Sequence, residues 1–593
     1  MKLVQLSIHN FRGIHSASLN FFDYNLLVGP NNAGKSTVID AIRVFYEKDG
    51  FKFRPDRDVP FIVGADQDSW LELLFSLSNA EDSSLADDYR QDDKTLRVKK
   101  FLKIGDKNRD GSIFAYKNDG NLSAEPFYGA KNVQSGKFGD IVFIPAVSKI
   151  DEHTKLSGPS ALRDLLTNVL EAVVASSASY EKFSKDFEAF AQGVKAERTD
   201  DGRSLAGLEA DLGALLESWD TAFLLEMNSP SVADIIKTLL SYQCIDKAHG
   251  KALAADQFGS GFQRHFIYSL IQIGAKYVGK KPSKKTKDFV PSMTLILFEE
   301  PEAFLHPPQQ ENLAQSLTKL ANNPDQQVIC STHSSHFVSR NAAHIPAIAC
   351  LKRDSGLVSA FQIDTKSWDE IVDANQAMNK IAVKWPKLKA RLEADDLRPE
   401  MEAVKYFLWL NPDRCGMFFA NHVLIVEGPS EQSFINKLLG DGNIKRPSDG
   451  LYVLDSIGKF NMHRFMNLLT ALGIQHSVIH DDDNSKDEHA EINQLIQDSK
   501  SVLTTAVCPV TGDLEALLEV SKPKSDHRKP QHLLFLHETG QITADRLRAF
   551  CVLVEGCLPK PPKEQKPERW MKPSEAGKGE IVIYQWEDGK AEG

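Results

Sequence analysis

Hydrophobic residues in the first 150 positions follow two different periods. Apolar residues recur every three to four positions from Ser36 to Tyr46, which predicts a helix. An apolar run and a glycine-rich stretch precede this segment, so the chain is expected to pass from strand to loop to helix. Short apolar or alternating runs predict strands at 2–8, 24–28, 70–77 and 141–147.

Strand signals nearly disappear between residues 156 and 250. Leucine and valine take up helical spacing near Leu162, and the pattern returns in 205–226 and 232–242. We therefore expect a helical insertion in this part of the chain. Predicted strands return at 293–298 and 327–330, with a helix at 308–321 between them. The insertion thus divides one α/β domain into two halves.

From residue 420 onward, strands and helices alternate at short spacing. The pattern predicts strands at 422–426, 451–454, 475–480 and 503–508, and helices at 430–439, 460–472 and 487–498. Such alternation predicts a small parallel sheet. The expected division is 1–155 and 256–370 for the halves of the first α/β domain, 156–255 for the helical insertion, 371–419 for a helical linker and 420–593 for the second domain.

Length and composition restrict the class of protein. A chain of 593 residues is too long for one core and is expected to form two to four domains. No apolar stretch approaches the roughly 20 residues that span a bilayer, and the N-terminus lacks a signal peptide, so we expect a cytoplasmic protein without membrane contact. The seven cysteines form no CxxC pair, which favours reduced thiols over a zinc module. A net charge of −11 gives no general attraction to nucleic acid.

The glycine-rich stretch matches the phosphate-binding pattern G-x-x-x-x-G-K-[ST]. Its glycines let backbone N–H groups surround a phosphate at a helix N-terminus, Lys35 reaches the β- and γ-phosphates, and the Ser36 hydroxyl ligates Mg²⁺. An incidental glycine-rich turn is the weaker interpretation, because the loop lies between a strand and a helix. The predicted nucleotide-binding residues of this loop are Gly29, Asn31, Asn32, Gly34, Lys35, Ser36 and Thr37.

Two later strands end in residues that complete a nucleotide site. Glu299 and Glu300 follow the apolar run Thr294–Phe298, where one carboxylate orders Mg²⁺ and the next orients the attacking water as a general base. His333 ends the next strand and is placed to sense the γ-phosphate; taken alone, it is more often a structural histidine. Gly259, Ser260 and Gly261 precede a helix and offer a further backbone nest for phosphate.

A second group of acidic residues lies at the strand ends of the C-terminal domain. Glu427 ends the run Val423–Val426, and Glu431 lies one helical turn later. Asp481 and Asp483 follow the run Ser477–Ile479. Such clusters hold one or two Mg²⁺ ions, which activate water and stabilise a phosphate transition state. For the three aspartates alone a solvated acidic turn is an equal alternative, but like charges in one cluster favour a cation.

The nucleotide motifs resemble the ATP-binding-cassette (ABC) ATPases of the SMC, Rad50 and RecF type. The segment Asn10–Ile14 is typical of their first strand and loop, Gly259–Gln263 is similar to their signature loop, and His333 is similar to their switch histidine. The resemblance implies ATP-dependent dimerisation, because the signature loop of one subunit covers the nucleotide of another. Glu299 replaces the usual Asp and the signature is altered, so slow hydrolysis is expected. Gln67 is a weak candidate for the Q-loop glutamine.

The acidic motifs resemble the Toprim domain of topoisomerases, DnaG-type primases and certain nucleases. Ser456–Lys459 matches a glycine-lysine turn found between the two acidic motifs. The resemblance adds Asp513 and Glu515 as further metal ligands and Lys572 as a lysine near the scissile phosphate. Neighbouring lysines compete for that last role, and a solvated basic loop is an equal interpretation for each of them: Lys560, Lys563, Lys566 and Lys578.

An ABC-type ATPase domain with a helical insertion, followed by a C-terminal Toprim domain, resembles the OLD (overcoming lysogenization defect) family of nucleases. The resemblance implies an α/β protein that binds ATP and uses Mg²⁺ or Mn²⁺ to nick or cut DNA, with Glu427, Asp481, Asp483 and Lys572 at the centre. It also implies a homodimer or tetramer built through the ATPase domain and the insertion, commonly in anti-phage defence. Some members act with a helicase, as in Gabija systems, or with a retron reverse transcriptase and its DNA.

Two other functions compete with this interpretation. A topoisomerase needs a tyrosine nucleophile in a large additional domain, and a primase usually carries a zinc module that the cysteine spacing does not provide. A non-nucleolytic ATP-dependent DNA clamp or repair ATPase would use the Toprim domain only for binding. The sequence leaves open whether ATP activates or inhibits cleavage.

Overall fold

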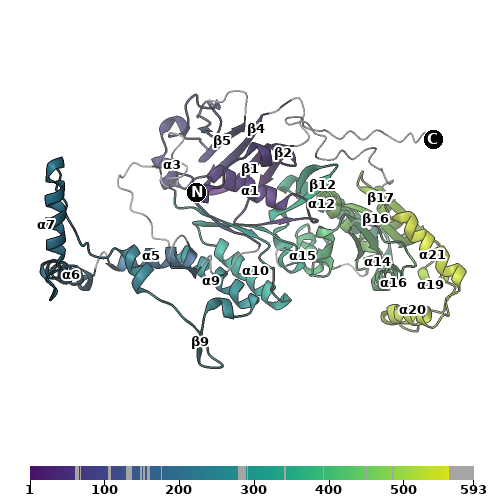
Figure 1. The fold of residues 1–593 in the computed structure, drawn as a ribbon. Helices are drawn as coiled ribbons and strands as arrows, with labels where there is room; N and C mark the ends of the chain where they lie inside the picture. Colours follow the sequence, from purple (N-terminus) through teal and green to yellow (C-terminus); the bar gives the residue numbers. More distant parts are fainter. Residues whose placement is uncertain are drawn as a thin grey trace, which may run out of the picture.

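The computed structural model shows an elongated molecule with a helical arm at one end and the C-terminal sheet at the other (Figure 1). It describes residues 1–60, 66, 68–103, 109–128, 137–146, 150, 154–156, 160–174, 177–277, 289, 291–339, 342–390, 393–447, 450–483 and 487–559. Gln67 and the C-terminal lysines Lys560, Lys563, Lys566, Lys572 and Lys578 lie outside the described residues.

Two sheets form the first α/β domain. One is antiparallel, in the order β2-β1-β4-β5-β6, and comprises β1 (Lys2–Phe11), β2 (Ile14–Asn20), β4 (Ser69–Ser76), β5 (Thr95–Lys103) and β6 (Ile113–Ala115). The other has the order β13-β12-β3-β11-β10-β7 and is parallel except for β13; it comprises β3 (Tyr24–Val28), β7 (Asp140–Ile144), β10 (Thr294–Glu299), β11 (Gln326–Ser331), β12 (Ile348–Asp354) and β13 (Leu357–Gln362).

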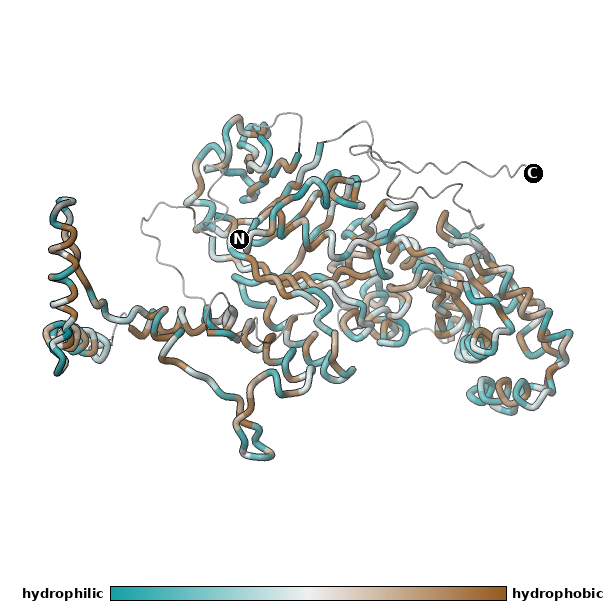
Figure 2. Tube along the Cα trace, viewed as in Figure 1, coloured by the Kyte–Doolittle hydropathy of each residue, from teal (hydrophilic) through white to brown (hydrophobic). Residues whose placement is uncertain are grey.

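The strand period of two separates the core into layers. Leu27 of β3 packs with α1 (Lys35–Tyr46) and the antiparallel sheet, whereas Leu26 and Val28 face the opposite layer with α10 (Pro307–Ala321). The helix α1 therefore lies between the two sheets, which fixes its N-terminus at the end of β3. Figure 2 shows hydrophobic residues along the central strands.

The insertion is mostly helical, but two expectations for it are wrong. It contains α5 (Ala161–Val174), α6 (Ala178–Ala196), α7 (Leu205–Leu216), α8 (Val232–Asp234) and a π-helix (Ile235–Leu239). The helix predicted over 205–226 ends at Leu216, because a 3₁₀ turn follows and Asp220 adopts a left-handed conformation with φ 53°. A hairpin of β8 (Cys244–Asp246) and β9 (Lys251–Leu253) also escaped prediction, since strands this short show no period.

The C-terminal domain contains the predicted parallel sheet, which is confirmed in the order β15-β14-β16-β17. Its strands are β14 (His422–Val426), β15 (Leu451–Asp455), β16 (Gln475–Asp481) and β17 (Thr504–Val510). The helices α16 (Pro429–Gly440), α17 (Met462–Ala471) and α18 (Asp487–Asp498) connect them, and α20 (Lys529–Glu538) and α21 (Ala544–Cys557) follow. No described helix is long and apolar enough to cross a membrane.

The segment predicted as a linker joins the two domains through one hydrophobic core. It contains α12 (Thr365–Asn375), α13 (Ala377–Lys384) and α15 (Glu400–Trp409). A single cluster of buried side chains runs from Leu26 of β3 through Tyr406 of α15 to Ile425 of β14. Two domains that share a core cannot rotate freely about a linker, because any rotation would expose apolar surface.

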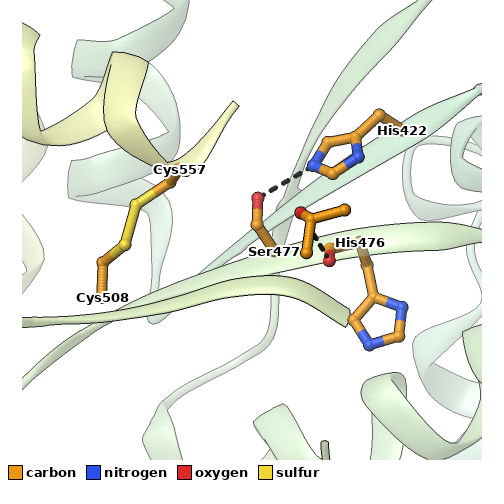
Figure 3. Close-up of a disulfide and its surroundings, with 6 residues drawn as sticks. His422, His476, Ser477, Cys508 and Cys557 are labelled. Carbon is orange, nitrogen blue, oxygen red and sulfur yellow. Dashed lines mark hydrogen bonds between the residues drawn. A yellow bond between two sulfur atoms is a disulfide. The ribbon is translucent and has the colours of Figure 1, made fainter. Parts of the chain in front are cut away.

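The expectation that all cysteines are reduced is wrong for one pair. Cys508 of β17 and Cys557 at the end of α21 form a disulfide, with their Cα atoms 6.7 Å apart (Figure 3). The two residues are 49 positions apart in the sequence, so no local spacing pattern predicts the disulfide. In the same view His422 and Ser477 join β14 to β16 through a side-chain hydrogen bond of 2.9 Å.

Candidate nucleotide and metal sites

The loop between β3 and α1 has a conformation that requires glycine at its two ends. Gly29 has φ 136°, and a Cβ there would lie 2.2 Å from the carbonyl oxygen of Leu351 in β12. Gly34 has φ 98°, and a Cβ there would lie 2.7 Å from Val358 of β13. The hairpin of β12 and β13 therefore supports the loop from outside, and no other residue fits either position without strain.

Lys35 folds back over this loop. Its Nζ donates hydrogen bonds to the carbonyl oxygens of Gly29 and Pro30 at 2.9 and 2.8 Å. Burial lowers the pKa of Lys35 to about 8. Within the described part of the chain no carboxylate forms an ion pair with it. A buried ammonium that lacks a carboxylate partner suits an anionic ligand such as a nucleotide phosphate.

The residues predicted to bind the Mg²⁺ of the nucleotide and to orient the attacking water lie close together beside α1. The Ser36 hydroxyl donates to the carboxylate of Glu299, which ends β10. Glu300 follows with φ 45°, a left-handed conformation that turns the chain sharply, and its carboxylate lies 3.4 Å from the His333 ring. Burial and the nearby charge of Lys35 lower the pKa of His333 to about 4, so the ring is neutral at physiological pH.

The remaining nucleotide candidates divide into two groups. Asn31 and Asn32 line a cavity of about 440 Å³ together with Arg353 and Asn421, while Thr37 lies in the first turn of α1 and donates its N–H to the Gly34 carbonyl oxygen. Of the signature-like residues, Gly259 directly precedes α9 (Ser260–Tyr277), and Ser260 and Gly261 begin it. Gly261 lies beside Phe304 and Gln309, so the helix N-terminus faces the segment after β10.

The acidic cluster forms where two neighbouring parallel strands end. Glu427 follows β14 and Asp481 ends β16, so both lie at the carboxyl edge of the sheet. The Asp481 backbone N–H donates to Glu427 Oε1 at 2.8 Å. Glu431 lies in the first turn of α16, Asp513 caps the N-terminus of α19 (Leu514–Leu517), and Glu515 lies in its first turn. The structure thus brings the predicted acidic residues to one edge.

Burial and mutual repulsion disfavour negative charge at this edge. Burial, with smaller contributions from neighbouring carboxylates, raises the pKa of Glu427 to about 7. The same causes raise the pKa of Asp481 to about 9, with Glu427 the largest contributing neighbour. Burial likewise raises the pKa of Glu431. A set of crowded oxygen donors that resist ionisation fits a divalent cation, which would stabilise the charged forms.

Two other carboxylates at this edge contact basic side chains of the protein. Asp513 pairs with Lys522, and Asp483 lies 3.5 Å from Lys459 and 3.2 Å from His489. In the described residues, no three acidic, histidine or cysteine side chains converge with the geometry of a metal site. Holding a cation therefore requires side-chain rotation, above all of Glu427, which accepts the backbone hydrogen bond of Asp481.

Sequence reasoning assigned no site role to the basic residues beside the cluster. Lys459 is 4% exposed and donates to the Asp481 carbonyl oxygen. Lys522 and Lys529 lie near Asp513 and Glu515, where their charges act on both carboxylates. Lys459 carried a usable signal, because it follows a glycine between the two acidic motifs. The other two lie in a loop and at a helix start without a motif.

Comparisons with known families identify both domains. Residues 24–339 match the family described as an AAA domain, putative AbiEii toxin, Type IV TA system, which is more than half of the chain. Residues 418–483 match the overcoming lysogenization defect protein-like TOPRIM domain. The chain belongs to the OLD family. Its ATPase and Toprim domains imply use of a nucleotide and of a divalent metal.

Relatives of this OLD-family chain align along most of its length. The "Old nuclease" of Escherichia phage P2 is 25% identical over 85% of this chain and 80% of its own length. The "OLD nuclease" of Thermus scotoductus is 21% identical over 92% of this chain and 97% of its own length. "Endonuclease GajA" of Bacillus cereus is 21% identical over 84% of this chain and 79% of its own length.

Among solved structures, an SMC head bound to the C-terminal winged-helix domain of ScpA aligns with 62% of this chain and with all of its own. The identity is 14% and the TM-score 0.36.

The raised pKa values predict a stabilising substitution. In the folded, metal-free protein Asp481 and Glu427 titrate at about 9 and about 7, above their ordinary values. Their contribution to stability is present below about pH 4 and is lost as pH rises through the folded values. We expect Asp481→Asn to raise Tm in EDTA at pH 8 by about 1 °C for each kcal/mol by which unfolding becomes less favourable, and to change Tm little at pH 4.

Differential scanning fluorimetry at both pH values measures this effect. Asp498→Asn, at an exposed position on α18, is the matched control and should leave Tm unchanged. A lower Tm for Asp481→Asn at pH 8 would show that the carboxylate is stabilised as an anion.

Proposed function

We propose that this OLD-family chain is a nucleotide-regulated DNA endonuclease that uses Mg²⁺ or Mn²⁺. One observation carries the proposal: Glu427 and Asp481 meet at the carboxyl edge of a parallel sheet and resist ionisation there. Buried carboxylates with strongly raised pKa values are typical of functional sites. The names of the relatives, which are nucleases and endonucleases, support the same activity.

Each residue at this edge has a proposed role. Glu427, Asp481 and Asp483 hold the metal, and Glu431, Asp513 and Glu515 complete its surroundings. A bound divalent cation supplies a water nucleophile of lowered pKa and stabilises charge on the phosphate. Lys522 and Lys529, at the rim of the cluster, attract and position the DNA backbone. Lys572 stays a prediction for stabilising the developing charge at the scissile phosphate.

The nucleotide site is proposed to control assembly and cleavage. Lys35 and Ser36 bind the phosphates and their Mg²⁺, Glu299 completes the metal side, Glu300 orients the attacking water, and neutral His333 contacts the γ-phosphate as a hydrogen-bond donor. Glu299 in place of Asp favours slow hydrolysis. Asn31, Asn32 and Thr37 contribute polar contacts to the same nucleotide.

The second half of a complete nucleotide site is proposed to come from another copy of the chain. Gly259, Ser260 and Gly261 would cover the nucleotide of that copy, giving a homodimer or tetramer. The arm of α6 and α7 stands clear of the body (Figure 1). Phe190 of α6, Leu215 of α7 and Trp219 in the turn that follows are exposed apolar side chains. Apolar surface of this kind supports the insertion as an assembly surface.

Anti-phage defence in the cytoplasm is the proposed setting, supported by the likeness to GajA. A helicase or a retron reverse transcriptase with its DNA is the expected kind of partner. Cleavage by the purified chain can be measured without the partner or the trigger.

Supercoiled plasmid tests the proposed activity directly. The purified protein is incubated with plasmid and Mg²⁺ or Mn²⁺, with and without ATP. We expect nicked and linear products that require the metal and whose rate changes with ATP. Relaxed covalently closed topoisomers would instead identify a topoisomerase, and unchanged plasmid in all conditions would contradict nuclease activity of the isolated chain.

A further inference from the structure

One short segment contacts both sites. Residues 413–421, here called the coupling segment, follow α15 and lead into β14. The segment contains the 3₁₀ helix η9 (Arg414–Phe419), in which Cys415, Met417 and Phe418 are fully buried. Because three of its side chains are part of the core, the segment can move only together with its neighbours.

On the nucleotide side, the coupling segment touches the switch histidine. The rings of Phe419 and His333 lie 6.3 Å apart between centroids. Lys352 of β12 donates from Nζ to the carbonyl oxygen of Ala420 at 2.5 Å. Asn421 lines the cavity beside the phosphate-binding loop. A change in the position of His333 or of β12 therefore directly alters the contacts of the three consecutive residues 419–421.

On the metal side, the coupling segment holds the end of β15. Arg414 donates from Nε to the Asp455 carbonyl oxygen at 3.0 Å and from Nη2 to its carboxylate at 2.8 Å. The Tyr452 hydroxyl donates to the Asp413 carbonyl oxygen. Gly416 packs so closely on Tyr452 that a Cβ would lie 2.6 Å from the ring. The paired hydrogen bonds of Arg414 fix orientation as well as distance.

The loop that follows Asp455 supports both acidic motifs. The Asp455 carboxylate accepts from the backbone N–H of Ile457 at 2.8 Å, and Ile457 adopts a left-handed φ of 60°. Gly458 donates its N–H to the Glu427 carbonyl oxygen at 2.6 Å. Lys459 donates to the Asp481 carbonyl oxygen. Three consecutive residues thus connect Asp455 to the two strand ends that carry the metal-binding candidates.

The elements around this loop are fixed to one another. Glu402 of α15 and Arg464 of α17 form a fully buried ion pair with two hydrogen bonds of 2.8 and 3.1 Å. The Tyr406 hydroxyl donates to the Arg464 carbonyl oxygen at 2.7 Å. Since α15 and α17 cannot slide past each other without breaking this pair, a displacement at His333 is taken up by the coupling segment between them.

We propose that the coupling segment transmits nucleotide state to the metal site, with Arg414 as the positioning residue that holds the 455–459 loop under Glu427 and Asp481. This proposal rests on the proposed nuclease function and specifies how that activity is regulated. A nucleotide held by His333 shifts Phe419, Arg414 follows, and the loop changes the spacing of the two acidic motifs. The coupling acts on the cleavage rate, and a rate effect does not require the metal site to change the affinity for nucleotide in return.

Phe419→Leu tests whether the contact between Phe419 and His333 transmits the nucleotide state. The substitution keeps a hydrophobic side chain but removes the ring that faces His333. We expect nucleotide-free cleavage within about twofold of wild type, unchanged ATP affinity, and a ratio of cleavage rates with and without ATP that falls to nearly 1. Phe407→Leu, on the same connecting helices and 51% exposed, is the matched control and should keep the wild-type ratio.

Arg414→Met tests whether Arg414 positions the 455–459 loop beneath the metal-binding carboxylates. We expect the metal concentration for half-maximal cleavage to rise about tenfold, because Arg414 orients the loop that supports the metal-binding carboxylates. Arg414→Lys should recover less than half of this loss, because lysine cannot reproduce the paired hydrogen bonds. A purely structural role would lower the amount of folded protein but leave the metal dependence of the folded fraction unchanged, and that result would overturn the positioning role.

Hydrogen exchange separates this inference from the nuclease assignment. A non-hydrolysable ATP analogue should change exchange in residues 451–466 of the wild type and of Phe407→Leu, but not of Phe419→Leu. If that pattern appears and no condition yields cleavage, the coupling stands and the nuclease proposal fails. If wild-type cleavage depends on ATP while exchange in 451–466 does not, or if Phe419→Leu keeps the full response, the coupling segment is not the connection.

Discussion

Replacing both Asp481 and Asp483 with Ala will lower DNA cleavage by about 10³-fold or more and will leave ATP affinity at its wild-type value. Asp481 ends β16 beside Glu427, and Asp483 follows in a left-handed conformation with φ 44°. Removing both leaves too few carboxylates to hold a cation against the phosphate. The nucleotide loop contacts neither residue, so ATP binding is unaffected.

Cleavage of supercoiled plasmid at saturating Mg²⁺ or Mn²⁺ measures the first effect, and binding of a fluorescent ATP analogue measures the second. Asp482→Asn is the control within the same motif. The Asp482 carboxylate accepts from the Gly512 N–H at 2.9 Å, a contact that Asn preserves. We expect this variant to retain cleavage within about threefold. If the double Ala variant still cleaves, the active site lies elsewhere in the chain.

The position of the acidic site could be predicted because it depends on strand ends. Glu427 and Asp481 each follow a short apolar run, and parallel neighbouring strands bring such residues to one edge whatever else the chain does. The same reasoning placed Ser36 near Glu299, since β3 and β10 belong to one parallel sheet. Periodicity and chain direction decide these contacts, and both are visible in a sequence.

The contacts between the sites could not be predicted, because they depend on tertiary packing. Arg414 contacts Asp455 across 41 positions, and Phe419 of the linker segment contacts His333 of the first domain; neither pair belongs to a periodic pattern. The Cys508–Cys557 disulfide is likewise invisible to spacing. The end of α7 at Leu216 was missed because its apolar residues continue past the last helical turn.

The shared core changes how the two activities relate to each other. Sequence periodicity predicted two domains joined by a helical linker but indicated no contact between the nucleotide and metal sites. Instead, one cluster of buried side chains includes β3, α15 and β14, and the buried Glu402–Arg464 pair fixes the linker to the C-terminal domain. A nucleotide-driven change in the first domain must therefore alter packing in the second.

Lys35→Ala will reduce ATP affinity by about 10²-fold or more and will abolish the effect of ATP on cleavage. The Lys35 ammonium lies over the loop carbonyls of Gly29 and Pro30, and no carboxylate among the described residues pairs with it. Its pKa of about 8 leaves it largely charged at neutral pH, ready to bond phosphate oxygens. Each lost hydrogen bond to a charged group contributes about 1.5–3 kcal/mol.

Titration calorimetry with ATP and Mg²⁺ measures the affinity, and plasmid cleavage with and without ATP measures the regulation. Lys319→Ala, at an exposed position on α10 of the same domain, should change neither quantity. Nucleotide-free cleavage by Lys35→Ala should match the wild type, because the acidic edge and the 455–459 loop are untouched. If ATP still alters cleavage by this variant, the nucleotide acts at a site other than the Gly29–Ser36 loop, and the path through His333 and Phe419 loses its starting point.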